Sequence, residues 1–246
     1  MRHRFFSASR PLVFAHRGGS ALAPENTIRA FDDGLALGAD GVELDVHLSR
    51  DGVVVVHHDH TLERMTTLRG PVAARSAREL AEAGVPALRE VLERYREARV
   101  IVEMKVNGSG IAAAVVDVVR RADAVDRVCL GGFGRRALRT ARAIEPAIAT
   151  SAAREEVRWA LYRSWVRWPV THPGYGGYQV PEWAGRTRVV SPRFIDAAHR
   201  AGLAVQVWTV NSEEDARRLL TWGADALITD RPDIIVPLVK GLGAPT

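Results

Sequence analysis

Two things are scarce in this chain of 246 residues: cysteine and long apolar runs. Cys129 is the only cysteine, which excludes an intrachain disulfide framework. No apolar run approaches the ~20 residues that a membrane helix needs. The opening stretch MRHRFFSASRPLVFAH also lacks the apolar core of about 7 to 15 residues found in signal peptides. We therefore expect a cytoplasmic protein without a transmembrane segment.

Lysine is almost absent as well. Lys105 and Lys240 are the only lysines among the 34 basic residues, and all the others are arginines. The net charge of +5 and the pI near 9.9 would suit a nucleic-acid partner, but the basic residues are spread along the chain and aromatic residues make up only 7%. We expect no nucleic acid among the partners. The arginine bias makes Lys105 conspicuous.

Short apolar strands alternate with amphipathic helical segments along the whole chain. The predicted strands end near residues 15, 45, 104, 130, 150, 180, 208 and 228. Eight such units over about 250 residues indicate a closed (β/α)8 TIM-type barrel. An open doubly wound sheet is the alternative, but no GxGxxG fingerprint follows the first strand. We expect one barrel domain over residues 1–246, with about ten N-terminal and eight C-terminal residues flexible.

An acidic pair lies on the second predicted strand. Glu43 and Asp45 are two residues apart in a β-rich run, so their side chains project from one face. Residues 49–52 have turn chemistry, and residues 53–56 form a β-branched run. The pattern predicts an extra antiparallel hairpin arm after the second barrel strand.

The register of this hairpin selects one of two adjacent histidines. If the loop consists of residues 50 and 51, antiparallel pairing sets Glu43 opposite His58. His58 then shares a face with the acidic pair, whereas His57 points to the other side. We therefore expect His58 to belong to the site.

Polar side chains also follow other predicted strands. His16 and Arg17 end the first strand and precede two glycines, which suits close approach of backbone to an anion but also fits an ordinary glycine turn. Glu103 and Lys105 lie at i and i+2 at the end of a buried strand. Because loops after barrel strands build the active sites of such folds, we expect these side chains to converge.

Seven motifs in this order resemble the glycerophosphodiester phosphodiesterase family: HRGG, PENT, DGVELDVHLSRDG, VVHHD, VEMK, VWTVN and ITDRPD. The resemblance spans roughly residues 13 to 234 and implies a barrel enzyme that uses a divalent cation to hydrolyse glycerophosphodiesters to sn-glycerol 3-phosphate and an alcohol. It implies His16 and His58 as the acid/base pair, Glu43, Asp45 and Glu103 as metal ligands, Arg17 and Lys105 as phosphate contacts, and Trp208 as a substrate-pocket residue. The stretch TLRG and residues 165–190 depart from the family pattern.

The chemistry also follows from the residue types. Three carboxylates without a nearby cysteine favour Mg²⁺ or Ca²⁺ over zinc, and their mutual repulsion would be relieved by one dication. With Arg17 and Lys105 the site would carry a small positive charge, which suits a diester anion. Two histidines can take and give protons near neutrality. The attacking group is either the glycerol 2-hydroxyl or water.

Several neighbouring residues have less specific interpretations. Glu25 either orients His16 or Arg17, or serves as a first-turn helix acid. We assign His47 to the rim of the site, and we expect Asp59 to be either structural or solvent-exposed.

Two other functions are compatible with the same residues. One is a lysophospholipase D or a sphingomyelinase D-like phosphodiesterase or lyase acting on lipids. The other is a phosphate-headgroup binding protein without catalysis, which the presence of both histidines, all three acids and Lys105 disfavours. The expected partner is a small-molecule glycerophosphodiester, and the sequence does not determine the oligomeric state.

Overall fold

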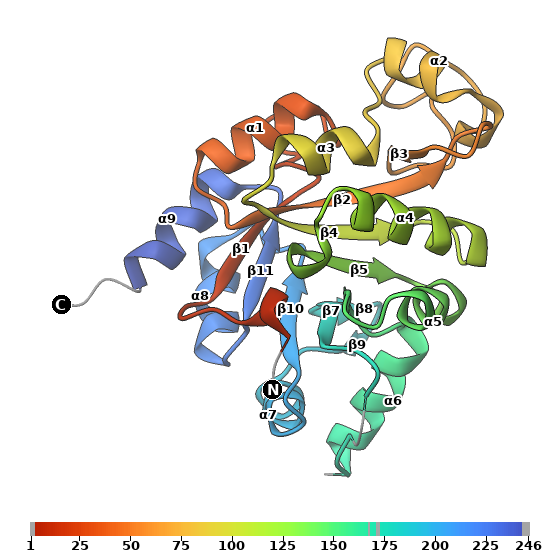
Figure 1. Cartoon of the computed structure of the whole chain (residues 1–246). Coiled ribbons are helices and arrows are strands. Elements are labelled where there is room, and N and C mark those ends of the chain that lie inside the picture. The colour runs from red at the N-terminus through yellow and green to blue at the C-terminus, as the bar shows by residue number, and fades with distance from the viewer. Residues whose placement is uncertain (1–2, 167, 171–172, 243–246) are drawn as a thin grey trace.

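The computed structural model describes residues 3–166, 168–170 and 173–242 and shows a parallel barrel surrounded by helices (Figure 1). Eight parallel strands pair in the order β6-β5-β4-β2-β1-β11-β10-β7. Their bounds are β1 Leu12–His16, β2 Gly41–Leu48, β4 Arg99–Met104, β5 Val128–Gly132, β6 Ala149–Thr150, β7 Gly177–Pro181, β10 Ala204–Trp208 and β11 Ala226–Thr229. A parallel bridge between Ser151 and Gly177 joins the two end strands. The predicted (β/α)8 barrel is confirmed, and the open sheet is excluded.

Nine α-helices lie outside the strands in the described part of the chain. They are α1 Ile28–Ala36, α2 Ala77–Glu82, α3 Leu88–Arg94, α4 Ser109–Arg121, α5 Arg135–Ile144, α6 Arg154–Trp165, α7 Pro192–Arg200, α8 Glu213–Thr221 and α9 Pro232–Leu242. Thr27, Ser76, Ser191 and Ser212 cap four of them by accepting a hydrogen bond from a first-turn amide. No helix within these described residues is long and apolar enough to cross a membrane.

Alternate residues of the barrel strands point inward, where they build a core of their own. Phe14, Ile101 and Ile228 belong to this inner cluster, and Phe5 and Phe6 close it from below. Both phenylalanines belong to the short 3-10 helix η1 (Arg4–Phe6) and are almost fully buried. Burying one such side chain stabilises the fold by about 1.5–3 kcal/mol. Phe5 and Phe6 thereby attach the N-terminal segment to the barrel.

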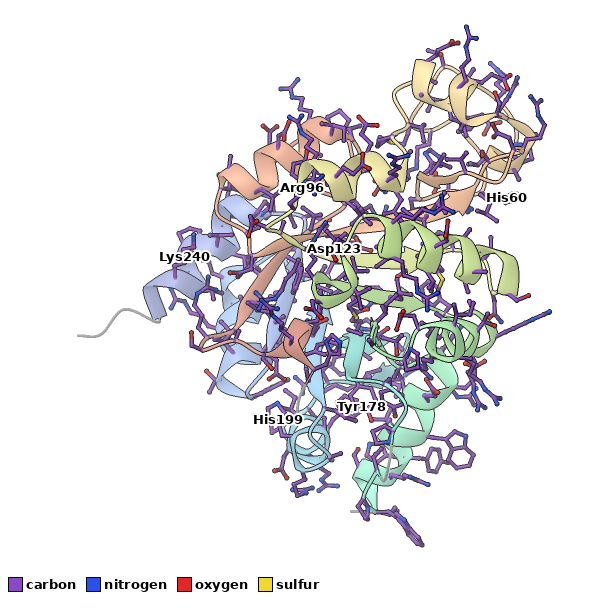
Figure 2. All side chains as sticks on the ribbon, viewed as in Figure 1. His60, Arg96, Asp123, Tyr178, His199 and Lys240 are labelled. Atoms are coloured by element: carbon purple, nitrogen blue, oxygen red, sulfur yellow. The ribbon has the colours of Figure 1, made fainter. Side chains whose placement is uncertain are left out.

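At the other end of the chain, residues 239–242, the first part of the tail expected to be flexible, continue α9. Residues 243–246 of that tail lie outside the described part of the chain. Figure 2 shows Lys240 on α9 at the periphery of the fold.

The predicted hairpin arm exists, but its register differs by one residue from the expected one. β3 (Val54–Val56) pairs antiparallel with β2, and Leu48 lies opposite Val54, not Val53. The loop is longer because Ser49 takes part in the turn: its hydroxyl accepts from the Val53 amide and donates to Asp51. The expected pairing of Glu43 with His58 is therefore wrong, and the ladder ends at Val56, before either histidine.

The arm rests on a small separate core. Val55, Leu62, Val72, Leu80 and Val85 are all buried there, with contributions from the 3-10 helix η2 (Val72–Ala74) and from α2. A third 3-10 helix, η3 (Val125–Arg127), precedes β5. The packing of the small core fixes the segment that follows β3 and carries His57 and His58.

A second, unpredicted hairpin follows β7. Its strands β8 (Trp183–Ala184) and β9 (Thr187–Arg188) form a separate two-stranded sheet beside the barrel mouth (Figure 1). The Arg188 guanidinium lies over the rings of Trp183 and Trp222, at 5.2 and 4.5 Å from their centroids. These cation-π contacts hold the hairpin against the rest of the fold.

Candidate active site

Strand register brings the acidic residues together. In the parallel ladders His16 lies beside Glu43, and Asp45 lies beside Glu103. Neighbours in register share a face, so these side chains enter the barrel mouth in adjacent layers. Ligand oxygens of Glu43, Asp45 and Glu103 all lie within 4.8 Å of one another. The structure thus joins the three acids that the sequence placed on two separate strands.

The acidic cluster is largely shielded from water. Glu43 and Asp45 are only 5% and 2% exposed. Burial and the neighbouring Asp45 carboxylate together raise the pKa of Glu43 to about 8, despite the opposing effect of His16. Buried carboxylates that repel one another need a cation, and an all-oxygen donor set suits a hard dication. The three acids fit one divalent cation.

Lys105 lies at the edge of this cluster. Its Nζ is 2.9 Å from Glu103 Oε1 and 3.2 Å from Asp45 Oδ1. Burial alone would lower the pKa of Lys105, but the two carboxylates outweigh it and raise the pKa above its usual value. Lys105 therefore keeps its positive charge at the site.

Arg17 lies on the other side of the same acids. Its backbone amide donates to Glu43, and its guanidinium donates from Nη1 to Glu25 at 3.1 Å. Its Nε is 3.3 Å from Asp45 Oδ2 without the alignment of a hydrogen bond. Of the interpretations open for Glu25, the structure supports orientation of Arg17.

His16 is held by a residue that the sequence analysis did not single out. Its Nδ1 is 2.6 Å from Asp230 Oδ1, so that Nε2 faces the acids, 3.8 Å from Glu43. Asp230 also accepts hydrogen bonds from Ser20 and Asn211. Burial opposes ionisation, but these bonds hold the pKa of Asp230 well below its usual range. The carboxylate therefore stays charged and fixes the ring of His16.

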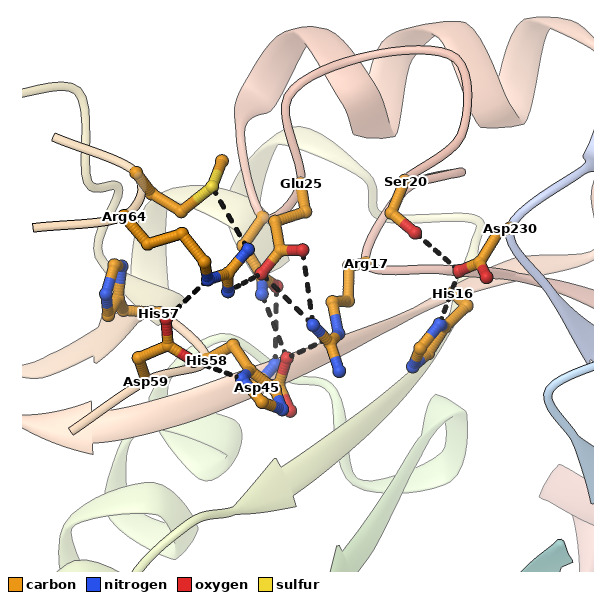
Figure 3. A network of polar contacts seen from close by, with 12 residues as sticks. His16, Arg17, Ser20, Glu25, Asp45, His57, His58, Asp59, Arg64 and Asp230 are labelled. Carbon is orange, nitrogen blue, oxygen red and sulfur yellow. Dashed lines mark hydrogen bonds and ion pairs between the residues drawn. The ribbon is translucent and has the colours of Figure 1, made fainter. Parts of the chain in front are cut away.

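His58 has a corresponding partner in Asp59. The His58 Nδ1 lies 2.7 Å from Asp59 Oδ1, and Asp59 also accepts from Arg64 at 2.6 Å. Arg64 in turn donates to Glu25, so that polar contacts run from His58 to Arg17 (Figure 3). The structural or solvent-exposed role expected for Asp59 is therefore corrected, because its carboxylate contacts and orients His58.

The other two histidines of this region are turned away from the pocket. His57 is buried, and its Nε2 contacts the carbonyl oxygen of Thr61 at 3.0 Å. His47 is also buried, 3.2 Å from the carbonyl oxygen of His58, and is not the rim residue that we expected. His58 therefore joins the acids even though the register used to select it is wrong, because the chain turns after Val56.

Asn26 supports the cluster from the PENT motif. Its amide nitrogen donates to Asp45 Oδ2 at 2.9 Å, and the residue is buried with a positive φ of 58°. The next residue, Thr27, is the N-cap of α1. Asn26 leaves the other Asp45 oxygen facing Lys105.

The three acids, the two site histidines and the two flanking cations line one pocket of about 630 Å³. Its wall includes His16, Arg17, Glu43, Asp45, His58, Glu103, Lys105 and Trp208. Every sequence-predicted site residue except Glu25 thus lines one cavity, and Glu25 contacts Arg17 from behind. Asp230 and Asp59 carried a usable signal: Asp230 continues the inward-facing alternation of Ala226 and Ile228, and Asp59 adjoins His58 in sequence.

Comparisons with known proteins agree with this geometry. The model of the "Glycerophosphoryl diester phosphodiesterase family" matches residues 16–234. A glycerophosphodiester phosphodiesterase of Caldanaerobacter subterraneus subsp. tengcongensis is 29% identical over 94% of this chain and 98% of its own. An uncharacterised Bacillus subtilis protein, YqiK, is 33% identical over 93% and 98% of the two chains.

Solved structures show the same similarity. The crystal structure of a glycerophosphodiester phosphodiesterase from Agrobacterium tumefaciens has a TM-score of 0.77 at 28% identity and covers 92% of this chain and 99% of its own. An Oleispira antarctica phosphodiesterase, solved in complex with the product sn-glycerol-3-phosphate, has a TM-score of 0.77 at 27% identity over 94% and 97% of the chains.

Proposed function

Because the chain belongs to the glycerophosphoryl diester phosphodiesterase family and is thus a phosphoric diester hydrolase, we propose that it cleaves glycerophosphodiesters to sn-glycerol 3-phosphate and an alcohol. The observation that carries this proposal is the convergence of three carboxylates and two aspartate-held histidines on one pocket. The product complex of the Oleispira antarctica relative supports the same product class.

Glu43, Asp45 and Glu103 would hold one divalent cation, Mg²⁺ or Ca²⁺. When bound, such an ion neutralises the buried carboxylates and polarises a phosphoryl oxygen. Arg17 and Lys105 flank the three acids and present two further positive charges to a phosphodiester anion. The chain thereby stabilises negative charge that builds on the phosphoryl oxygens in the transition state.

The two histidines differ in the charge of their environment. Asp230 receives hydrogen bonds from the neutral donors Ser20 and Asn211, so its full negative charge favours the imidazolium form of His16. Asp59, in contrast, is paired with the Arg64 guanidinium as well as with His58. We assign His16 as the general acid that protonates the leaving alcohol and His58 as the general base.

Roles for the remaining pocket residues follow from their positions. Trp208 ends β10 and forms part of the pocket wall, where its ring would pack against the substrate. Glu25 orients Arg17, and Asn26 orients Asp45.

The proposal is tested by measuring release of sn-glycerol 3-phosphate from a panel of glycerophosphodiesters, including the choline, ethanolamine and glycerol diesters. The protein is first freed of metal with a chelator and then supplied with Mg²⁺ or Ca²⁺. We expect release only with added cation. Absence of the product under every condition would refute the proposed function.

A further inference from the structure

The pocket extends well beyond the acids and histidines. Its far part, here called the α6 groove, lies between α6 and the segment that contains the β8–β9 hairpin. Its wall consists mainly of apolar side chains: Val157, Leu161, Tyr162, Trp165, Val180, Pro181, Ala184 and Val189. The groove and the three carboxylates belong to one continuous cavity of about 630 Å³.

Side chains along one face of α6 line this groove. Residues 154, 157, 158, 161, 162 and 165 all line the cavity and follow helical spacing. The adjoining face packs into the core through Ala160, Leu161 and Ser164. From Arg154 to Trp165 the groove-lining face is roughly 16 Å long. A helix that lines a cavity over three turns provides an elongated site, not a compact one.

The position of the groove limits what can occupy it during a reaction. A group that lies there while the phosphate is at the carboxylates must be a substituent of the same diester, because the cavity is continuous. Small polar alcohols would gain little from apolar walls, whereas a hydrocarbon chain gains from leaving water. We propose that the α6 groove binds the aliphatic chain of a single-chain glycerophospholipid. This inference rests on the proposed phosphodiesterase function and specifies its substrate class.

The surface around the groove has the composition of a lipid-facing rim. Tyr162 and Trp165 line the groove and are 64% and 49% exposed. Tryptophan and tyrosine favour the boundary between lipid and water because their rings combine an apolar body with a polar tip. Arg154 and Arg158 add positive charge to the same pocket wall. Such a rim suits a substrate that leaves a lipid surface.

A chain-length series tests the inference. Glycerophosphocholine and lysophosphatidylcholines of increasing acyl length, each below its micelle-forming concentration, are compared by kcat/KM for diester cleavage. We expect kcat/KM to rise by up to about fourfold per added methylene until the groove is full. Values that do not increase with chain length, in a protein that cleaves glycerophosphocholine, would overturn the groove assignment and leave the phosphodiesterase function intact. Failure to cleave any diester would overturn the function itself.

Two variants place the effect in the groove. Ala184→Trp fills the groove from the exposed β8 strand, and Trp165→Ala removes part of its wall. Each should lower kcat/KM for the longest-chain substrate at least tenfold more than for glycerophosphocholine. Trp159→Ala, on the outer face of the same helix, is the matched control and should not change this ratio. An unchanged ratio in both groove variants, with far-UV circular dichroism showing them folded, would refute the assignment.

Discussion

The assignment of His16 as acid and His58 as base predicts that the activity of the two alanine variants depends differently on the leaving group. An alkoxide needs a proton to leave, whereas a para-nitrophenolate leaves without one at neutral pH. His16 is held 2.6 Å from Asp230 with Nε2 turned toward the acids, a geometry suited to donating that proton. Loss of a general acid typically costs 10²–10⁴-fold in rate, or about 2.7–5.5 kcal/mol of transition-state stabilisation.

The assay compares His16→Ala and His58→Ala on glycerophosphocholine and on the para-nitrophenyl diester of glycerol 3-phosphate. For His16→Ala we expect about 10²–10⁴-fold loss on the choline diester and less than about tenfold loss on the nitrophenyl diester. For His58→Ala we expect losses of about 10²–10⁴-fold on both. An equal loss of His16→Ala on the two substrates would refute the assignment, and rescue of His58→Ala by the nitrophenyl group would reverse the two roles.

Three further predictions follow from single contacts. Lys105→Arg should lose at least about tenfold in kcat/KM, or ~1.4 kcal/mol, because a forked guanidinium cannot replace an ammonium wedged between two carboxylates; wild-type kinetics would show that the lysine is incidental. His57→Ala should lower the free energy of unfolding by about 1–3 kcal/mol in urea denaturation while keeping turnover within about tenfold, unlike His58→Ala; inactivity of folded His57→Ala would contradict the placement of the two histidines. Burial lowers the pKa of His16, but Glu43 and Asp230 raise it more, so Asp230→Asn should move the alkaline limb of the pH–rate profile to lower pH; an unmoved limb would argue against this coupling.

Strand periodicity was sufficient to predict the barrel. Each strand is a short apolar run between helical segments. Alternation along the strands also predicts that Glu43, Asp45 and Glu103 point into the barrel mouth. The inference worked because parallel register leaves little freedom: residues at equivalent heights on neighbouring strands share a face.

The errors arose where side chains, and not strand periodicity, decide the geometry. The hairpin register depends on the Ser49 hydroxyl, which binds the Val53 amide and lengthens the turn by one residue. The burial of Phe5 and Phe6 below the barrel could not be predicted from two phenylalanines in a polar stretch. The contact of Asp230 with His16 joins residues 214 positions apart, a separation that no local pattern encodes.

The central claim, a divalent cation held by Glu43, Asp45 and Glu103, is tested most directly by titrating metal-free protein with Mg²⁺ or Ca²⁺ while heat of binding and diesterase activity are followed in parallel. The account predicts one ion bound per chain, activity that rises in proportion to occupancy, and loss of both in Asp45→Asn. Full activity in the metal-free protein would contradict the account. So would a wild-type activity that rises with added ion while the Asp45→Asn variant binds the ion as tightly as the wild type.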